Sequence, residues 1–198
     1  MTSTQTESLH DIAIRLVSPT QGILAADESK ATLDKRFALL SLPSSLENRR
    51  AYRELLFTTP GIEQYISGAI LYNETIKQST KDGQPFVKLL ENRGIIPGIK
   101  VDLGTAPLPS STEKITNGIE DLAPRLNEYV PLGAKFTKWR AVIEIDSDRY
   151  PTDSCIAMNS ARLADYAKIA QDAGLVPIVR RLLRARRRGG RSRRAFLQ

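Results

Sequence analysis

The feature that most constrains this chain is the regular alternation of short apolar stretches with amphipathic ones. Four stretches have the dense apolar, β-branched composition of buried strands. Three of them close in polar or charged residues, and the fourth carries two cations, Lys138 and Arg140. Segments with helical spacing or helix-ending residues separate the stretches. The four strand-like stretches span residues 22–29, 67–74, 95–102 and 133–143, and a fifth begins at 175–179.

Helices are expected between these strands. The pair Ser44 and Glu47 has the spacing of a capping box, which predicts a helix from there to about residue 57. Gly94 and Gly174 end two other helical patterns. We therefore expect helices at about residues 8–16, 44–57, 85–93, 120–129 and 159–173, and a loop at 104–118, which is rich in Pro, Ser and Thr.

Near-continuous apolar strands that alternate with helices predict a parallel sheet, built either as an open doubly wound sheet or as a (β/α)8 barrel. An open sheet usually has a glycine-rich turn after its first strand, and this chain has none there. A barrel brings all its strand ends to one mouth, which favours the barrel. The polar strand ends are Asp27 and Glu28, Asn73 and Glu74, Lys100 and Asp102, and Lys138 and Arg140.

The stretch 133–143 places Lys138 and Arg140 on one face of a strand, because they lie two residues apart. They either line a site or lie in water on an edge strand. Together with Asp27 and Lys100, these cations predict a pocket for a phosphorylated, oxygen-rich small molecule with an acid and a base beside it. A lysine near other cations can also act as a neutral amine toward a ketone.

Charge is divided unevenly along the chain. Of the 29 Lys and Arg residues, nine lie in residues 180–198, a segment without Asp or Glu, so residues 1–179 carry 20 basic and 22 acidic side chains. We expect two parts, a globular domain at 1–179 and a disordered arginine-rich tail at 180–198. The tail is either the product of a shifted reading frame or a basic arm that binds nucleic acid, acidic lipid or another polyanion.

Several single residues complete the prediction. Cys155 is the single cysteine, so no internal disulfide forms, and an inert thiol in a reducing cytosolic compartment is expected. Trp139 is expected in the core between strand and helix, and Tyr65, Tyr72 and Tyr166 are assigned to packing. No run of 18 apolar residues and no secretory signal is present, so no association with a membrane is expected.

Several motifs, in order and at compatible spacings, resemble class I fructose-bisphosphate aldolase over residues 7–179. They are Leu24-Ala25-Ala26-Asp27-Glu28-Ser29, Glu47-Asn48-Arg49-Arg50, Gly98-Ile99-Lys100-Val101-Asp102, Lys138-Trp139-Arg140 and Gly174-Leu175-Val176-Pro177-Ile178-Val179.

The resemblance implies an incomplete (β/α)8 TIM barrel, about strands 1–5 with their helices, from a cytoplasmic, usually tetrameric lyase of glycolysis and gluconeogenesis. It implies reversible cleavage of fructose 1,6-bisphosphate to dihydroxyacetone phosphate and glyceraldehyde 3-phosphate through a lysine Schiff base, with no metal and no cofactor. The expected partners are the phosphorylated sugar and further copies of the full-length protein.

Carried over residue by residue, the resemblance assigns catalytic roles to three residues. Asp27 handles the substrate hydroxyls and moves protons, Lys138 assists formation and dehydration of the carbinolamine, and Lys100 orients Asp27. The residues that it places near a substrate phosphate or along the pocket are Ser29, Thr32, Lys35, Arg36 and Arg140.

The chain departs from the family after Val179. There the family continues Glu-Pro-Glu, whose first glutamate is an acid/base, whereas this chain has Arg180-Arg181-Leu182. A guanidinium cannot take up a proton at neutral pH, so this role is lost. The Schiff-base lysine of the family belongs to the sixth strand. We therefore expect no aldolase turnover from this polypeptide, and the alternative is a non-catalytic fragment that binds a polyanion through its tail or binds an intact aldolase subunit.

Overall fold

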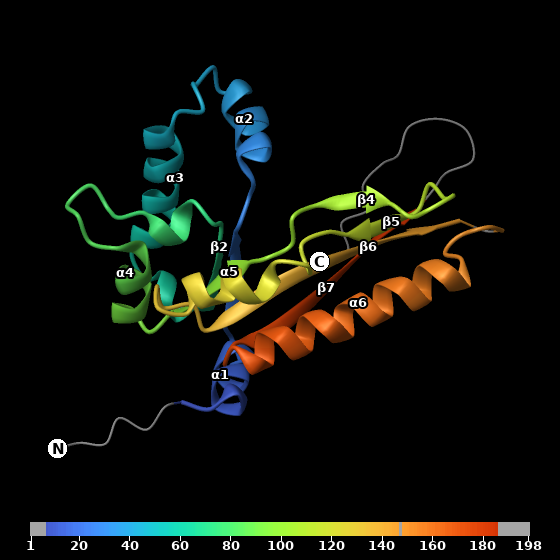
Figure 1. The fold of residues 1–198 in the computed structure, drawn as a ribbon. Coiled ribbons are helices and arrows are strands. Elements are labelled where there is room, and N and C mark those ends of the chain that lie inside the picture. Colours follow the sequence, from blue (N-terminus) through green and yellow to red (C-terminus); the bar gives the residue numbers. More distant parts are fainter. Residues whose placement is uncertain (1–6, 147, 186–198) are drawn as a thin grey trace.

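The computed structural model describes residues 7–146 and 148–185 of the 198-residue chain. A five-stranded sheet forms its centre, with the strands neighbouring one another in the order β1-β2-β3-β6-β7. Figure 1 shows its last two strands, β6 and β7, alongside α6. Every pairing in this sheet is parallel. Its strands are β1 (Gly22–Ala26), β2 (Ile66–Leu71), β3 (Ile96–Lys100), β6 (Phe136–Ile145) and β7 (Val176–Ala185).

Helices precede or connect the strands. They are α1 (Leu9–Leu16), α2 (Lys30–Ala38), α3 (Leu46–Thr58), α4 (Phe86–Asn92), α5 (Leu122–Tyr129) and α6 (Asp153–Asp172), with the short 3₁₀ helices η1 (Ile62–Gln64) and η2 (Thr75–Lys77). Helices α3 to α6 pack on the outer face of the sheet. The parallel sheet covered by helices confirms the predicted incomplete (β/α) barrel.

The larger core lies between the sheet and its helices. Trp139 of β6 is 1% exposed and stacks on Tyr166 of α6, with ring centroids 5.2 Å apart, so the expected core position of Trp139 is confirmed. Tyr65 differs from its assignment to packing, because its side chain is largely exposed. The cluster also contains Leu71, Phe86, Ile99, Leu122 and Leu126, among others.

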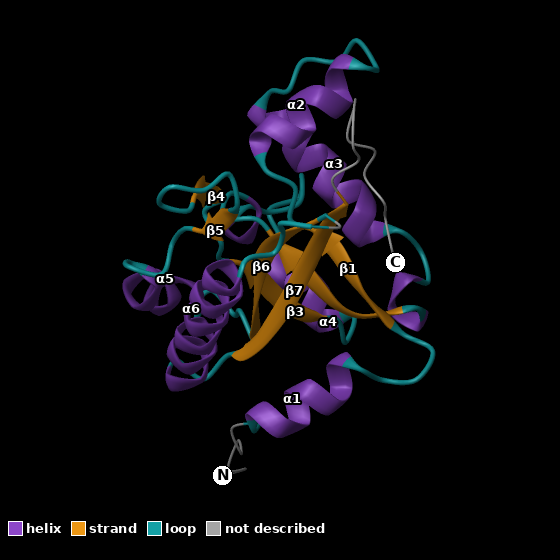
Figure 2. Cartoon of the chain, turned by 90° about the vertical axis from the view of Figure 1, so that its right-hand side faces the viewer, coloured by secondary structure: helices purple, strands orange, loops and turns teal. Residues whose placement is uncertain are grey.

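A second, smaller core lies on the inner face of the sheet. Phe136 of β6 packs there with Ile70 of β2 and Ile96 of β3. Residues Ile12 and Leu16 of α1 close this core from below. Figure 2 shows α1 at one end of the sheet and α2 at the opposite end.

The inner core requires a glycine at one position of β3. A Cβ added at Gly98 would lie 2.3 Å from the ring of Phe136, and Phe136 is fully buried. Because barrel interiors are filled by side chains from alternate strands, the large ring of β6 occupies the space that β3 leaves empty.

The expected loop at 104–118 instead contains an antiparallel hairpin. Its strands, β4 (Thr105–Pro107) and β5 (Lys114–Thr116), pair in register. The hairpin lies beside β6, because the Thr116 hydroxyl donates to the carbonyl of Arg140 at 2.7 Å. This tertiary contact orders a segment whose composition predicts a loop.

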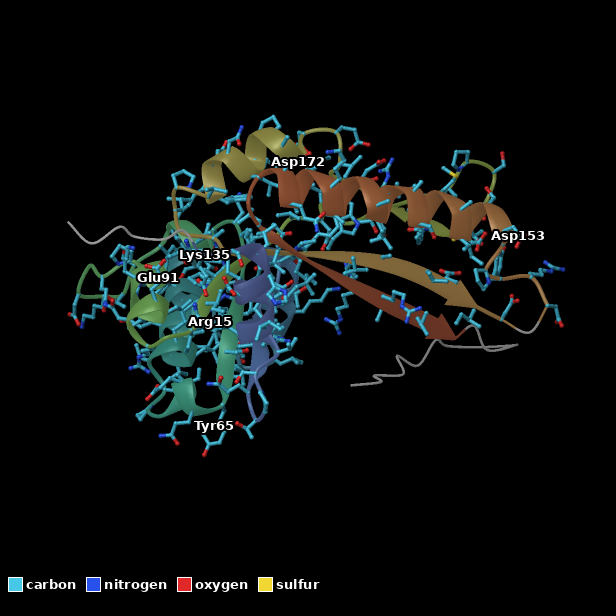
Figure 3. All side chains as sticks on the ribbon, turned by 90° about the horizontal axis from the view of Figure 1, so that it is seen from below. Arg15, Tyr65, Glu91, Lys135, Asp153 and Asp172 are labelled. Carbon is cyan, nitrogen blue, oxygen red and sulfur yellow. The ribbon has the colours of Figure 1, made fainter. Side chains whose placement is uncertain are left out.

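Two helix starts also differ from the prediction. The cap of α3 is Ser45, whose hydroxyl accepts from the backbone N–H of Asn48 at 3.1 Å, so the predicted capping box at Ser44 is wrong. Helix α6 begins at Asp153 because Thr152 caps it, several residues before the predicted start. Figure 3 shows α6 from Asp153 to Asp172 alongside β6 and β7. Helix α2 was missing from the prediction.

The last described strand extends beyond the expected domain boundary at residue 179. Strand β7 pairs with β6 residue by residue from Val176 to Ala185. Backbone hydrogen bonds hold this ladder, and they do not depend on the type of side chain. The predicted disordered tail is therefore wrong for residues 180–185, and its remainder, 186–198, lies outside the described residues.

Two further observations concern the Cys155 thiol and the expectation of no membrane association. The pKa of the Cys155 thiol is raised to about 11 by burial and by its hydrogen bond to Glu113, as expected for an inert thiol. Within residues 7–146 and 148–185, no helix combines the length and the hydropathy that a membrane crossing needs.

We predict that Gly98→Ala destabilises the protein by about 1–3 kcal/mol, because the new methyl group overpacks the inner core against Phe136. Urea-unfolding curves measure this change. Gly22→Ala is the matched control, because Gly22 is also a strand residue and its added Cβ meets nothing within 4 Å. Equal stabilities of the two variants would contradict the packing of the inner core.

Candidate active site

Two carboxylates and two lysines meet where the strands end. Asp27 follows β1, Lys100 ends β3, Asp102 lies two residues later, and Lys138 lies in β6. Because side chains alternate along a strand, these residues share the inner face with Phe136. The inner face is thus apolar near α1 and charged at the carboxyl ends of the strands.

Asp27 and Lys138 form a buried ion pair. The Lys138 ammonium donates to Asp27 Oδ2 at 2.8 Å, and the two side chains are 5% and 11% exposed. A buried charge is costly to desolvate, so each member of the pair depends on the other.

This ion pair requires a curved sheet. Strands β1 and β6 are separated by β2 and β3 in the sheet order. Three strand spacings in a flat sheet amount to roughly 14 Å, which exceeds the combined reach of Lys138 and Asp27. The contact therefore forms across the concave interior, as expected for a barrel and not for an open sheet.

Lys100 forms a second ion pair beside the first. Its ammonium lies 3.0 Å from Asp102 Oδ1 and donates to the Asp102 carbonyl at 2.6 Å. Asp102 Oδ2 lies 4.0 Å from the Lys138 ammonium and is buried without a hydrogen-bond partner. Lys100, which was predicted to orient Asp27, forms no hydrogen bond or ion pair with it among the described residues, where the cation at Asp27 is Lys138.

The glutamates at the strand ends turn toward helix α3. Arg53 of α3 forms a buried ion pair with Glu28, and Arg49 binds both carboxylate oxygens of Glu74, at 2.8 and 2.6 Å. Burial alone would raise the pKa of Glu28, but the hydrogen bond and charge of Arg53 outweigh it and lower that pKa. These glutamates hold α3 against the sheet and leave the inner site to Asp27 and Asp102.

Three of the predicted phosphate-binding residues, Thr32, Lys35 and Arg36, are exposed on α2. The fourth, Ser29, is the half-buried N-cap residue of this helix, and its hydroxyl lies 3.2 Å from that of Thr32. Arg36 forms an ion pair with Glu28 and donates to the Tyr52 hydroxyl at 3.3 Å. Lys35 is exposed on the same helix. Among the described residues, no hydrogen bond or ion pair joins this group directly to Lys138.

Arg140 lies on the inner face of β6, two residues after Lys138. Its side chain is half-buried, and its Nε is buried without a hydrogen-bond partner. The residue beside it in register is Arg180 of β7. The structure therefore brings together Asp27, Lys100, Lys138 and Arg140 on one face, and it leaves Ser29, Thr32, Lys35 and Arg36 on the neighbouring helix.

Sequence reasoning missed the part played by Asp102. Its side chain is fully buried between the two lysines, at 3.0 Å from Lys100 and 4.0 Å from Lys138. The signal was present, because a residue two positions after Lys100 must share its face. The arrangement supplies ammonium groups to bind or protonate a substrate oxygen, and carboxylates to accept protons.

Two other features frame the site. A cavity of about 970 Å³ lies elsewhere, between the tip of the β4–β5 hairpin and the start of α6, and Glu113 and Tyr150 are among its lining residues. No group of three or more His, Cys, Asp or Glu side chains in the described part of the chain could hold a metal ion.

The family model "Glycolytic: Fructose-bisphosphate aldolase class-I" matches residues 8–183. A probable fructose-bisphosphate aldolase class 1 of Xanthomonas campestris is 53% identical over 174 residues, which are 87% of this chain and 52% of that protein. A fructose-bisphosphate aldolase of Echinococcus multilocularis is 50% identical over 175 residues, 87% of this chain and 48% of that protein. The chain thus spans about half the length of these relatives.

A solved structure gives the same result in three dimensions. It is a ternary co-crystal structure of fructose-bisphosphate aldolase from Plasmodium falciparum with TRAP and a small-molecule inhibitor. The likeness has a TM-score of 0.86 at 48% sequence identity and covers 88% of this chain and 51% of that chain.

We predict that Lys138→Met destabilises the protein by about 3–5 kcal/mol, because Asp27 then remains as an uncompensated buried charge. Replacing both residues, as Lys138→Met with Asp27→Leu, should cost less than Lys138→Met alone. Chemical denaturation of the three proteins measures this. Lys30→Met, which breaks an exposed helical pair with Asp34, is the control and should change little. A double variant less stable than Lys138→Met would contradict the ion-pair argument.

We predict that the Glu28–Arg53 pair gives stability that is lost in acid. Because the folded-state pKa of Glu28 lies below its ordinary value of 4.5, the contribution is complete above 4.5 and disappears as the pH falls through the lowered pKa. Glu28→Gln should be less stable at pH 7 and should lose less stability than the parent on acidification. Unfolding curves between pH 7 and 3 measure the difference.

The control for this pH series is Glu128→Gln, which removes a carboxylate whose side chain is 63% exposed. Its loss of stability on acidification should match that of the parent. If Glu28→Gln and the parent lost equal free energy of unfolding between pH 7 and 3, Glu28 would not be the source of the acid sensitivity.

Proposed function

Because this chain belongs to the class I fructose-bisphosphate aldolase family, a family of lyases, we propose that it forms the part of such an aldolase that contains barrel strands 1–5. The complete enzyme would cleave fructose 1,6-bisphosphate reversibly to dihydroxyacetone phosphate and glyceraldehyde 3-phosphate through a lysine Schiff base. It would act in glycolysis and gluconeogenesis in the cytoplasm, as a tetramer.

The buried ion pair of Lys138 with Asp27 carries this proposal. The two groups lie 2.8 Å apart at the carboxyl ends of β6 and β1, on the concave face of the sheet. Active sites of (β/α)8 barrels lie at this end, with catalytic residues from several strands. Charges buried together in such a place, where they cost stability, support a catalytic role.

Each inner-face residue has a role that its position supports. Lys138 donates a proton to the substrate oxygen that leaves as water, and Asp27 accepts protons from the substrate hydroxyls. Lys100 is held by Asp102 at 3.0 Å and contributes to the positive potential of the site. It acts on Asp27 indirectly, because Asp102 also lies 4.0 Å from Lys138, the partner of Asp27. General acid–base catalysis by positioned groups of this kind contributes about 10²–10⁴-fold to a rate.

The residues of α2 supply a place for one substrate phosphate. Ser29 and Thr32 offer two hydroxyls 3.2 Å apart, and Lys35 and Arg36 offer cations on the same helix. Arg140 lines the pocket from β6. Hydroxyls and charged side chains are the usual partners of phosphate oxygens.

The 198-residue polypeptide itself should be catalytically inactive. By the resemblance, Arg180 takes the position of the acid/base glutamate of the family, and a guanidinium cannot exchange protons at neutral pH. The Schiff-base lysine of the family belongs to a later strand. Without its nucleophile, a covalent mechanism retains only binding and electrostatics.

A second function for this polypeptide is polyanion binding through its basic end. Residues 180–198 contain nine arginines and no acidic residue, and six of these arginines follow residue 185. Basic segments bind nucleic acid by releasing counterions, so salt-dependent retention on heparin that is lost on deleting 186–198 would support this function.

We predict that the 198-residue protein gives no adduct when borohydride is added with dihydroxyacetone phosphate, as intact mass measures. An adduct would contradict its inactivity. By contrast, a chimera of residues 8–179 with the C-terminal half of the Xanthomonas campestris relative should cleave fructose 1,6-bisphosphate.

In this chimera, Lys138→Met and Asp27→Asn should each lower kcat by about 100-fold or more. Lys30→Met, on the exposed face of α2, is the control and should retain the parent kcat. A folded chimera in which Lys138→Met is as active as the parent would overturn the proposed role of the ion pair.

A further inference from the structure

Two arginines lie side by side on the inner face of the sheet. Arg140 of β6 and Arg180 of β7 are register partners in a parallel pair. Partners in register point to the same face, and the face is the inner one because Val176 and Ile178 pack there with Phe136. Neighbouring strands are about 5 Å apart, so the two side chains start from adjacent points.

Among the described residues, neither arginine forms an ion pair with a carboxylate. Arg140 is half-buried, and its Nε is buried without a hydrogen-bond partner, whereas the side chain of Arg180 is exposed. A buried charged donor without an acceptor is costly, and like charges directly opposite each other on neighbouring strands repel. The backbone of Arg140 is held in place, since its carbonyl accepts from the Thr116 hydroxyl at 2.7 Å.

Both inner-face carboxylates at the strand ends, Asp27 and Asp102, already form ion pairs with lysines. Asp27 binds Lys138 at 2.8 Å, and Asp102 binds Lys100 at 3.0 Å. With the two carboxylates paired to the two lysines, Arg140 and Arg180 leave a local surplus of two positive charges. A single doubly charged anion would neutralise that surplus.

We propose that Arg140 and Arg180 together bind a doubly charged oxyanion, a phosphate group either free or as a monoester. Each guanidinium presents parallel N–H donors that fit two oxygens of a tetrahedral anion, and two forks from adjacent strands can bind different oxygens of the same group. The site rests on Arg180, at a position where the resemblance implies a glutamate in the family, and does not depend on the proposed aldolase activity.

The test is the binding of inorganic phosphate to the 198-residue protein, by isothermal titration calorimetry at constant ionic strength. Arg180→Gln and Arg140→Gln should each weaken binding at least tenfold. Arg181→Gln is the matched control, because it removes the same charge from the same strand on the opposite face, where Arg181 is exposed. It should change the affinity less than twofold.

Two further measurements define the ligand and exclude a folding defect. Sulfate should compete with phosphate, and chloride should not. Tighter binding of glycerol 3-phosphate than of inorganic phosphate would identify an ester as the ligand, and equal binding would identify the free anion. Without phosphate, Arg180→Gln should unfold at the parent's temperature or above, because it relieves repulsion.

Two results would overturn the proposal. The first is the absence of saturable phosphate binding. The second is an equal loss of affinity in Arg181→Gln and Arg180→Gln, because it would show a diffuse attraction of phosphate to a basic strand. Arg180→Lys distinguishes charge from geometry. It keeps the charge but loses the fork, so an intermediate affinity is expected, and retention of full phosphate affinity would overturn the bidentate arrangement.

Discussion

The buried ion pair between Lys138 and Asp27 depends on the curvature of the sheet, and the rest of the inner face is arranged to permit it. The two residues come from strands that are not neighbours, and they meet only because the sheet is concave. Below them, the ring of Phe136 fills the space left by Gly98, which lets the strands curve around a packed interior. The charged layer therefore lies on an apolar layer closed by α1.

The polar residues that end the strands have two different structural roles, and adjacent residues in the sequence take different ones. Asp27 points inward to Lys138, whereas Glu28, the next residue, binds Arg53 of α3. This follows from the alternation of side chains where the backbone leaves the strand. The inward carboxylates remain available for chemistry, and the outward ones stabilise the helix that covers the barrel.

The mouth of this half barrel combines residues expected of an aldolase with one that is not. Lys138 and Asp27 form a compensated pair, which suits proton transfer. Arg180 adds a second guanidinium beside Arg140, and within the described part of the chain it has no ion-pair partner. Binding an anion needs only positive charge and donors in the right geometry, whereas turnover needs a group that exchanges protons, so the loss of a proton-exchanging group does not by itself remove anion binding.

The sequence by itself determined that five strands of a parallel sheet are present and that Asp27, Lys100, Lys138 and Arg140 lie on its inner face, because side-chain periodicity is local. Only the tertiary structure decided which groups meet. It paired Asp27 with Lys138 and not with Lys100, ordered the hairpin at 104–118 against β6, and extended β7 to Ala185 along β6. These outcomes depend on curvature and on backbone partners from distant segments, which no local pattern contains.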